Sequence, residues 1–189
     1  MLQAATELFL EKGFERTSLC QVVWRSKGSR STLYEQFGNK EGLLKAMIEA
    51  ACERVWEVID ADADSPPLSE DSLVDLGLRI VDAALAPNAV AVFRIVTAEG
   101  PRVPGIAEHF FDSGPRILQE RLAERFRKAP TDVTGSPEQM AKVFLGAVLG
   151  DFHFRVVVGL APGPSPEETD AYVRVAVRIF LQGIGRGLV

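Results

Sequence analysis

The stretch SKGSRSTLYEQFGNKEGLL, from Ser26 to Leu44, concentrates hydroxyl and cationic residues at the start of a predicted helix. Four polar residues, Ser29 to Thr32, come just before the apolar positions Leu33 and Phe37. Serine and threonine suit the beginning of a helix better than its interior, because their oxygens accept hydrogen bonds from the first free N–H groups. The pattern therefore predicts a helix that ends at Gly38 and presents hydroxyl groups and a positive charge at its first turn.

A second short helix is predicted just upstream of this one. Thr17 and Ser18 can cap its start, and three apolar residues between positions 19 and 23 form its inner face. A link of four residues, 26–29, separates the two helices. Two short helices joined by a tight turn that contains glycine form a helix-turn-helix, whose second helix enters the major groove of DNA. The sequence thus predicts binding to double-stranded DNA.

Individual residues near the second helix have side chains suited to this contact. Arg30 can donate two hydrogen bonds to a guanine edge, and Thr32 can contact a thymine methyl group or a phosphate. Tyr34 and Lys40 are expected beside the DNA backbone, where they would fix the register. The predicted DNA-binding residues are Thr17, Ser18, Lys27, Ser29, Arg30, Ser31, Thr32, Tyr34 and Lys40.

The charge distribution agrees with a local contact to a polyanion. The chain of 189 residues has a net charge of −5, yet residues 16–40 contain five basic residues against Glu35 alone. A small basic patch on an acidic body fits one nucleic-acid contact rather than a protein that coats nucleic acid. A solvated helix face explains the same charges equally well, so charge alone does not decide between the two.

The remaining sequence has helical periodicity and no convincing strand alternation. The predicted fold class is all-α, with a three-helix DNA-binding domain over residues 1–45 and a helical ligand-binding and dimerisation domain over 46–189. A long fourth helix, N-capped by Asn39, is expected to connect the two domains. Further helices are predicted over residues 69–86, 88–99, 104–112, 114–129, 137–160 and 166–187.

Two segments of the first 48 residues resemble the DNA-binding domain of the TetR family of bacterial transcriptional regulators. These are AATELFLEKGFERTSLCQVVWRS, from residue 4 to 26, and STLYEQFGNKEGLLKAMI, from residue 31 to 48. VFRIVTAEGPRVPGIAEHFFDSGP and FLGAVLGDFHFRVVVG are similar to the AefR-like type of ligand domain in that family. The resemblance implies a homodimer that binds a near-palindromic operator and that a small-molecule effector loosens from DNA, most often as a repressor.

The chain departs from the family pattern at the turn. The family usually has glycine at the position of Lys27 and an apolar residue at that of Gly28. A residue with a side chain costs roughly 1 kcal/mol or more at positive φ, so either Lys27 carries this strain or the turn is shifted by one residue. Trp24 stands where a polar residue is ordinary and is expected to pack against another surface. No basic arm precedes Met1 in this sequence, so either phosphate contacts from such an arm are absent or the start codon is misplaced.

The resemblance also implies a ligand cavity and a dimer face in the C-terminal part. Family cavities are mostly aromatic and apolar with few polar anchors, and long helices rich in small and apolar residues can form a self-complementary face. The candidate cavity residues are Trp56, Phe93, Phe110, Phe111, Phe144 and His153. The candidate dimer residues are Phe144, Leu145, Val148, Phe152, Val175 and Ile179.

Several polar residues have a structural interpretation beside a functional one. His153 is expected either as a core histidine bonded to Asp151 or a nearby backbone group, or as a pocket or pH-sensing residue. Glu99 and Arg102 are expected to be exposed, paired with each other, or in contact with the ligand. Cys20 and Cys52 are expected as reduced, buried residues rather than redox sensors.

Other functions find little support in the sequence. The acidic run at 60–64 has serine and proline where a calcium loop needs glycine, so a solvated loop is the favoured interpretation. No paired acid and base or enzyme motif is present, and we expect no enzymatic activity, cofactor or metal. The absence of an apolar run of about 18 residues and of a secretion signal predicts a cytoplasmic protein without a membrane contact. A dimeric helical scaffold with weak or no specific DNA binding stays as the alternative.

Overall fold

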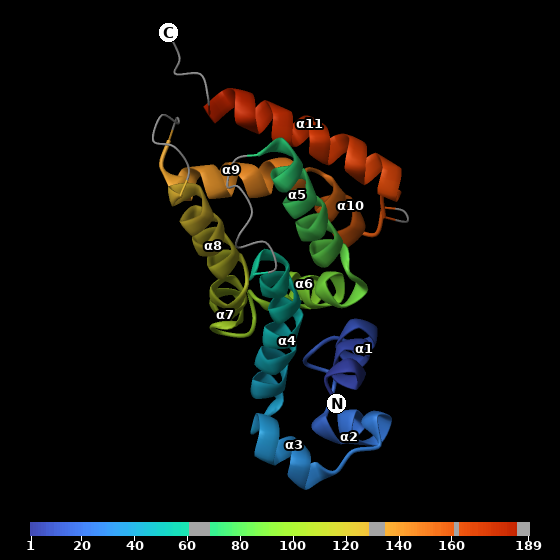
Figure 1. Cartoon of the computed structure of the whole chain (residues 1–189). Coiled ribbons are helices and arrows are strands. Elements are labelled where there is room, and N and C mark those ends of the chain that lie inside the picture. The colour runs from blue at the N-terminus through green and yellow to red at the C-terminus, as the bar shows by residue number, and fades with distance from the viewer. Residues whose placement is uncertain (61–68, 129–134, 161–162, 185–189) are drawn as a thin grey trace. The chain divides into compact units, whose positions relative to one another are not determined.

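The computed structural model describes residues 1–60, 69–128, 135–160 and 163–184. All regular structure in these ranges is α-helical, as the sequence predicts (Figure 1). The calcium-loop interpretation concerns residues that lie almost wholly outside the described ranges. The helices are α1 (Leu2–Lys12), α2 (Leu19–Ser26), α3 (Arg30–Phe37), α4 (Lys40–Asp60), α5 (Glu70–Leu85), α6 (Pro87–Glu99), α7 (Ile106–Ser113), α8 (Pro115–Arg127), α9 (Pro137–Leu149), α10 (Phe152–Val157) and α11 (Pro166–Ile184).

Capping residues set most of the helix boundaries that the sequence predicts. Gly13 ends α1 at φ 82°, and Ser18 begins α2 with a reciprocal capping box to Gln21. Ser29 accepts a hydrogen bond at the start of α3, and Asn39 Oδ1 accepts one from the N–H of Gly42 across 2.8 Å at the start of α4. These predictions are confirmed because capping depends on neighbours within a few residues in the chain.

The single helix predicted over residues 137–160 is wrong, because the chain breaks between α9 and α10. Gly150 has φ 50° and ψ −137°, a backbone conformation that residues with a β-carbon rarely adopt. A β-carbon at this position would also collide with the ring of Tyr172 on α11. The break therefore results from a close approach of two helices that are distant in sequence.

The chain divides into two compact units. The first contains residues 1–53 and 87–114, and the second contains residues 54–86 and 115–189. In the first unit α1 packs against α2 and α6, α2 packs against α3, and α6 packs against α7. In the second unit α5, α9 and α11 pack against one another, and α8 packs against α9. These units follow packing rather than chain order, and the predicted domain boundary at residue 45 stays a prediction.

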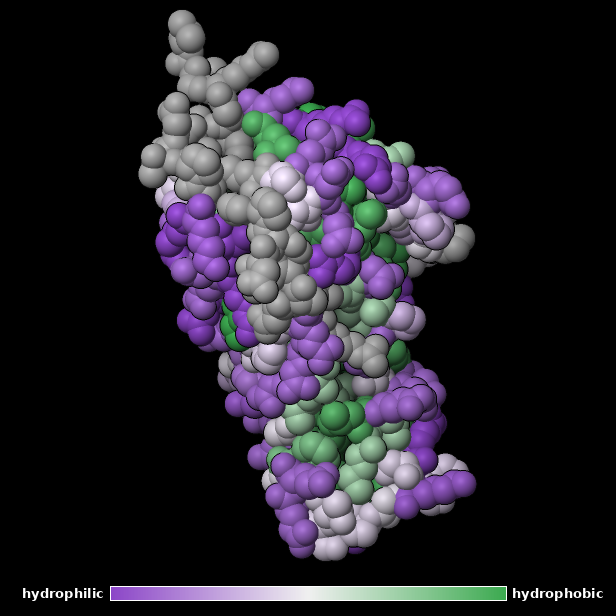
Figure 2. Space-filling model, in the orientation of Figure 1, coloured by the Kyte–Doolittle hydropathy of each residue, from purple (hydrophilic) through white to green (hydrophobic). Residues whose placement is uncertain are grey.

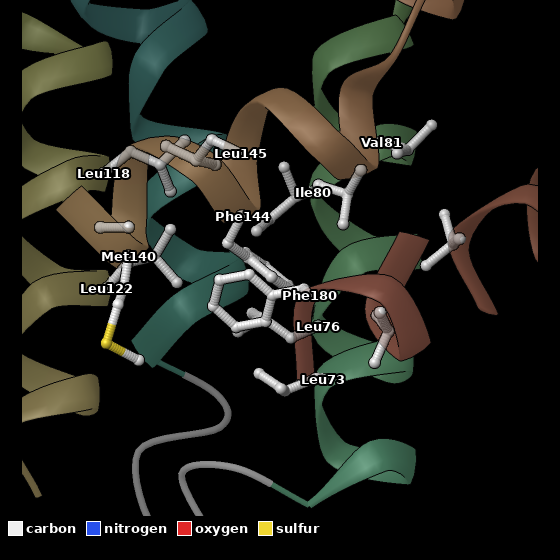
Figure 3. Close-up of a cluster of buried hydrophobic side chains, with 14 of the residues drawn as sticks. Leu73, Leu76, Ile80, Val81, Leu118, Leu122, Met140, Phe144, Leu145 and Phe180 are labelled. Carbon is white, nitrogen blue, oxygen red and sulfur yellow. The ribbon is translucent and has the colours of Figure 1, made fainter. Parts of the chain in front are cut away.

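The second unit has a large apolar core. Its members include Leu73, Leu76 and Ile80 of α5, with Leu118 and Leu122 of α8 (Figure 3). Three phenylalanines complete the core, with ring centroids 5.3 to 6.0 Å apart: Phe126, Phe144 and Phe180. Close-packed apolar side chains of this kind provide the main stabilisation of a helical domain.

The surface is largely hydrophilic on the face that Figure 2 shows, with apolar side chains exposed in smaller groups among the described residues. Within the described part of the chain no single helix is long and apolar enough to cross a membrane. The pair α5 and α6 passes that test only when the two helices are taken together, and they are bent by 61° at their junction.

Candidate nucleic-acid interface

The turn between α2 and α3 sets the aim of the predicted recognition helix. Lys27 has φ 51° and ψ 30°, the left-handed conformation, and its N–H donates to the carbonyl of Trp24 across 3.3 Å. The alternative of a turn shifted by one residue is therefore wrong, since the positive φ falls on Lys27 itself. Beside it, the end of the Met1 side chain occupies the space that a β-carbon of Gly28 would need. A methionine thus lies against the position where an apolar residue was expected.

The first turn of α3 gathers hydroxyl groups on an exposed surface. Ser29 Oγ accepts the N–H of Thr32 across 3.1 Å and lies 2.8 Å from Ser31 Oγ and 3.0 Å from Thr32 Oγ1. Arg30, the first residue of the helix, is fully exposed. The N-terminus of a helix favours anions, because its first N–H groups lack partners within the helix. The three hydroxyls and the guanidinium are therefore placed where a phosphate or a base edge can reach them.

Arg30 also contacts α2, through a side-chain hydrogen bond from its guanidinium to the sulfur of Cys20. This bond is the main cause that raises the pKa of Arg30. Cys20 is exposed rather than buried, which corrects the expectation for that residue. The contact orients Arg30 over the exposed side of α2, a relationship that the sequence pattern did not reveal.

Two residues predicted to bind DNA are engaged inside the first unit. Thr17 is 2% exposed, and its hydroxyl donates to the carbonyls of Leu8 and Gly13 across 3.2 and 2.9 Å. Its side chain is therefore not available to DNA, and that prediction is wrong. Lys40 Nζ donates to the carbonyl of Phe14 across 3.0 Å and lies 4.4 Å from the centroid of its ring. A DNA contact of Lys40 stays a prediction beside this structural role.

The charges of residues 16–40 are also partly neutralised within the fold. Arg25 binds Glu11 with both guanidinium nitrogens, at 2.7 and 3.0 Å, and lies 3.6 Å from Glu7. The hydrogen bond between them raises the pKa of Arg25 and lowers that of Glu11. Arg16 and Lys27 are exposed, and neither has a carboxylate partner within the described residues. The positive charge of this region that no carboxylate offsets thus comes from Arg16, Lys27, Arg30 and Lys40, whose ammonium group binds only backbone carbonyls.

The remaining predicted contacts differ in accessibility. Ser18 uses its side chain in the capping box, with its Oγ 3.3 Å from the nitrogen of Gln21. Tyr34 is 54% exposed on α3, so about half of the residue is accessible to another molecule. Both positions are compatible with the backbone contacts that the sequence predicts, and both contacts stay predictions.

The predicted ligand residues fall into different environments. In the first unit the rings of Phe93 and Phe110 meet edge to face at 5.6 Å, whereas Phe111 is 48% exposed. In the second unit Phe144 is fully buried among other phenylalanines, which makes it a core residue and corrects its assignment to a cavity. Trp56 Nε1 is buried and has no hydrogen-bond partner among the described residues. Buried donors are usually paired, so this N–H is available to a bound molecule.

Titratable groups near these residues have mainly structural partners. Glu99 is buried and accepts the N–H of Phe14, while Arg102 donates to the carbonyl of Ala98 across 2.8 Å, so the two do not form the predicted pair. His153 is partly buried, and desolvation lowers its pKa. Burial raises the pKa of the Cys52 thiol to about 11, with the charge of Glu49 as a second cause, which makes this thiol unreactive.

His109 is a residue that the sequence did not single out. Its Nε2 lies 3.1 Å from Glu49 Oε1, an ion-pair distance, without a hydrogen bond of good geometry. The spacing of the two residues in the chain gave no signal for this contact between α4 and α7. Among the described residues no group of three or more histidine, cysteine or acidic side chains is arranged to hold a metal ion.

The predicted dimer face is only partly exposed. Phe144, Leu145, Val148 and Phe152 are at most 8% exposed within a single chain, so they are core residues and the prediction for them is wrong. Val175 and Ile179 of α11 are 53% and 65% exposed. They line an open apolar groove of about 450 Å³ between α9 and α11. Its other apolar members include Val143, Ala147 and Tyr172.

The error on α9 is one of rotation. Val143 is 60% exposed, whereas its neighbour Phe144 is fully buried, because each residue turns about 100° around the helix axis. The sequence indicates that this helix is apolar on both sides, so the sequence alone does not show which side is covered. Only the position of α5 and α8 decides which side is covered.

Comparisons with known proteins cover nearly the whole chain. Residues 1–47 match the family described as bacterial regulatory proteins of the tetR family, and residues 71–183 match the C-terminal domain of AefR-like transcriptional repressors. The transcriptional regulator UidR of Escherichia coli K12 is 30% identical over 142 residues, which are 73% of this chain and 68% of that protein.

Solved structures share the fold. A TetR-family transcriptional regulator from Mesorhizobium loti has a TM-score of 0.85 at 22% identity, covering 98% of this chain and 95% of the other. The flavonoid-responsive regulator FrrA has a TM-score of 0.75 at 29% identity, covering 97% and 94%.

Proposed function

Because this chain belongs to the TetR family of transcriptional regulators, with an AefR-like C-terminal domain, we propose that it is a dimeric repressor released from a palindromic operator by a small effector. Members of the family are regulators rather than enzymes. The observation that carries the proposal is the first turn of α3, where Ser29, Ser31 and Thr32 cluster around a helix N-terminus beside the exposed Arg30.

The operator contact follows from the geometry of this motif. The N-terminal end of α3 enters the major groove, Arg30 contacts a base edge, and the hydroxyl groups and Tyr34 contact the backbone. Two such helices in a dimer contact successive major grooves, roughly 34–36 Å apart, which requires a near-palindromic site. The dimer forms through the groove between α9 and α11, whose exposed apolar side chains would otherwise remain in water.

The effector is a small apolar or amphipathic molecule with an aromatic ring. The half-buried pair Phe93 and Phe110 of the first unit offers aromatic surface to such a molecule. FrrA, a relative of 29% identity over nearly the full length, is flavonoid-responsive. A planar polyphenol is therefore the first class of molecule to test. Binding of the effector weakens DNA binding through a coupling free energy of about 1–3 kcal/mol.

A mobility-shift assay with the DNA upstream of the chain's own gene tests this function. We expect a sequence-selective complex whose affinity falls steeply between two salt concentrations, because phosphate contacts release counterions. Addition of a flavonoid should then release the DNA, with a non-aromatic compound of similar polarity as the control. Selective binding without release would retain the regulator and exclude this effector class. No selective binding, with a dimer present in sedimentation, would favour the scaffold alternative.

A further inference from the structure

The most exposed large apolar side chain among the described residues is Trp24, on α2. It is 82% exposed, whereas most large apolar side chains of the first unit are buried. Its indole N–H has no hydrogen-bond partner within the described part of the chain. Water contact with a whole indole is unfavourable. Since single apolar residues are common on protein surfaces, the surroundings of the ring decide what it can bind.

The position of Trp24 relates it to the recognition helix. Trp24 and Cys20 are four residues apart on α2 and so share one face of that helix. Cys20 accepts the hydrogen bond of Arg30, the first residue of α3. The face of α2 that carries Trp24 is thus the face directed to the N-terminal end of α3. Val22, by contrast, is fully buried on the opposite side.

The surroundings of Trp24 are cationic. Lys27, bonded through its N–H to the Trp24 carbonyl, is exposed, and Arg30 follows on the same exposed surface. Glu7 and Glu11 are bound to Arg25, and the acidic residues nearest to Trp24 in sequence, Glu15 and Glu35, are exposed. An apolar ring with free cations beside it matches a surface that is anionic and also offers flat apolar groups. A sugar–phosphate backbone has this combination, since deoxyribose carbons alternate with phosphates.

We propose that Trp24 is a DNA-contacting residue that packs its indole on the sugar–phosphate backbone beside the α3 contact and donates its N–H to a phosphate oxygen. The inference rests on the proposed function, because it requires that α3 binds DNA. In a helix-turn-helix the first helix crosses the backbone while the second occupies the groove. This arrangement places the Cys20–Trp24 face of α2 over one strand. The contact adds affinity without adding charge.

Fluorescence of Trp24 tests the inference directly. The chain has two tryptophans, so Trp56→Phe leaves Trp24 as the sole indole. Acrylamide, a neutral quencher that phosphates do not repel, should quench Trp24 strongly in the free protein. In the complex with duplex DNA of the upstream region the quenching constant should fall roughly twofold or more, because the ring loses its contact with water.

Two substitutions separate the neutral contact from a charged one. Trp24→Ala should weaken DNA binding about fivefold to tenfold, by the same factor at every salt concentration. Lys27→Ala should instead reduce the slope of log affinity against log salt by about 0.9 for each head. Phe154→Ala, which removes an exposed aromatic side chain from α10 outside the helix-turn-helix, is the matched control and should leave DNA binding unchanged.

The outcomes distinguish the inference from the function on which it rests. A DNA complex in which acrylamide still quenches Trp24 fully, or in which Trp24→Ala binds normally, would overturn the inference alone. Quenching that falls with protein concentration in the absence of DNA would also overturn it, because a second copy would then cover the ring. If the unaltered protein forms no complex with any duplex, the proposed function fails and the inference fails with it.

Discussion

The backbone N–H of Phe14 donates a hydrogen bond to Glu99 Oε1 across 3.1 Å, although the two residues are 85 positions apart in the chain. On the other side of the same residue, the carbonyl of Phe14 accepts from Lys40 Nζ across 3.0 Å. The loop between α1 and α2 is therefore held by the last residue of α6 and by the first residue of α4. Because Glu99 is 9% exposed, this contact is shielded from water.

Removal of the Glu99 carboxylate should destabilise the first unit. Glu99→Ala leaves the N–H of Phe14 without its acceptor in a buried place, which costs about 1–3 kcal/mol in the free energy of unfolding. Urea unfolding followed by far-ultraviolet circular dichroism measures this loss. Glu99→Gln keeps an oxygen acceptor and should retain most of the stability. Equal losses in the two variants would mean that the charge, rather than the hydrogen bond, holds the loop.

Arg30 and Tyr34 should affect DNA binding in different ways. Tyr34→Ala removes a backbone contact and should weaken binding to all duplexes about equally. Arg30→Ala removes the proposed base contact and should lower affinity for the operator by about 1–3 kcal/mol while it relaxes the sequence preference. Mobility shifts on the operator and on a scrambled duplex measure both effects. If the Arg30 variant prefers the operator over the scrambled duplex as strongly as the unaltered protein does, Arg30 does not contact a base.

The strain at the turn predicts a gain of stability with a loss of function. Lys27→Gly relieves a left-handed backbone at φ 51° and should raise the free energy of unfolding by about 0.5–1 kcal/mol. The same change removes an exposed cation, so DNA affinity should fall and depend less on salt. Thermal unfolding and salt-dependent mobility shifts report the two effects separately. A variant that loses stability would show that the Lys27 side chain makes a contact worth more than the strain.

The sequence predicts features that depend on neighbouring residues better than features that depend on contacts between distant helices. Caps at Ser18, Ser29 and Asn39 are local, and a residue and its neighbours within one turn are enough to predict them. The break at Gly150 depends on Tyr172, which approaches from another helix. An apolar run that contains glycine gives no sign of that approach, so the sequence predicts a continuous helix.

The candidate site shows the same division. Hydroxyl groups at the start of α3 were predicted because their helix position is local. The buried hydroxyl of Thr17 and the engaged amine of Lys40 were not, since both bind backbone carbonyls brought close by the fold of the first unit. Likewise the pairing of Cys20 with Arg30 depends on the angle between α2 and α3, which the turn of residues 27–29 connects.

His153 should make the protein sensitive to acid. Burial lowers its pKa below the ordinary value of 6.5, so the unfolded chain binds a proton more readily than the folded one. The stability contributed by neutral His153 is complete above about pH 6.5 and is lost as the pH falls below that value. Unfolding by urea at pH 7.5 and 5.5 should show a smaller difference for His153→Gln than for the unaltered chain. An unchanged difference would assign the acid sensitivity to other groups.

The groove between α9 and α11 should be the dimer interface, and a charge placed there should separate the subunits. Ile179→Glu puts a carboxylate on an exposed apolar face, so the single chain should fold normally while sedimentation detects a monomer. Phe154→Glu on α10 is the matched control, because Phe154 and Ile179 are both 65% exposed, and it should remain a dimer. A monomer from Phe154→Glu, with a dimer from Ile179→Glu, would move the interface to α10. Loss of the dimer should also abolish selective DNA binding, since one head contacts only half of a palindrome.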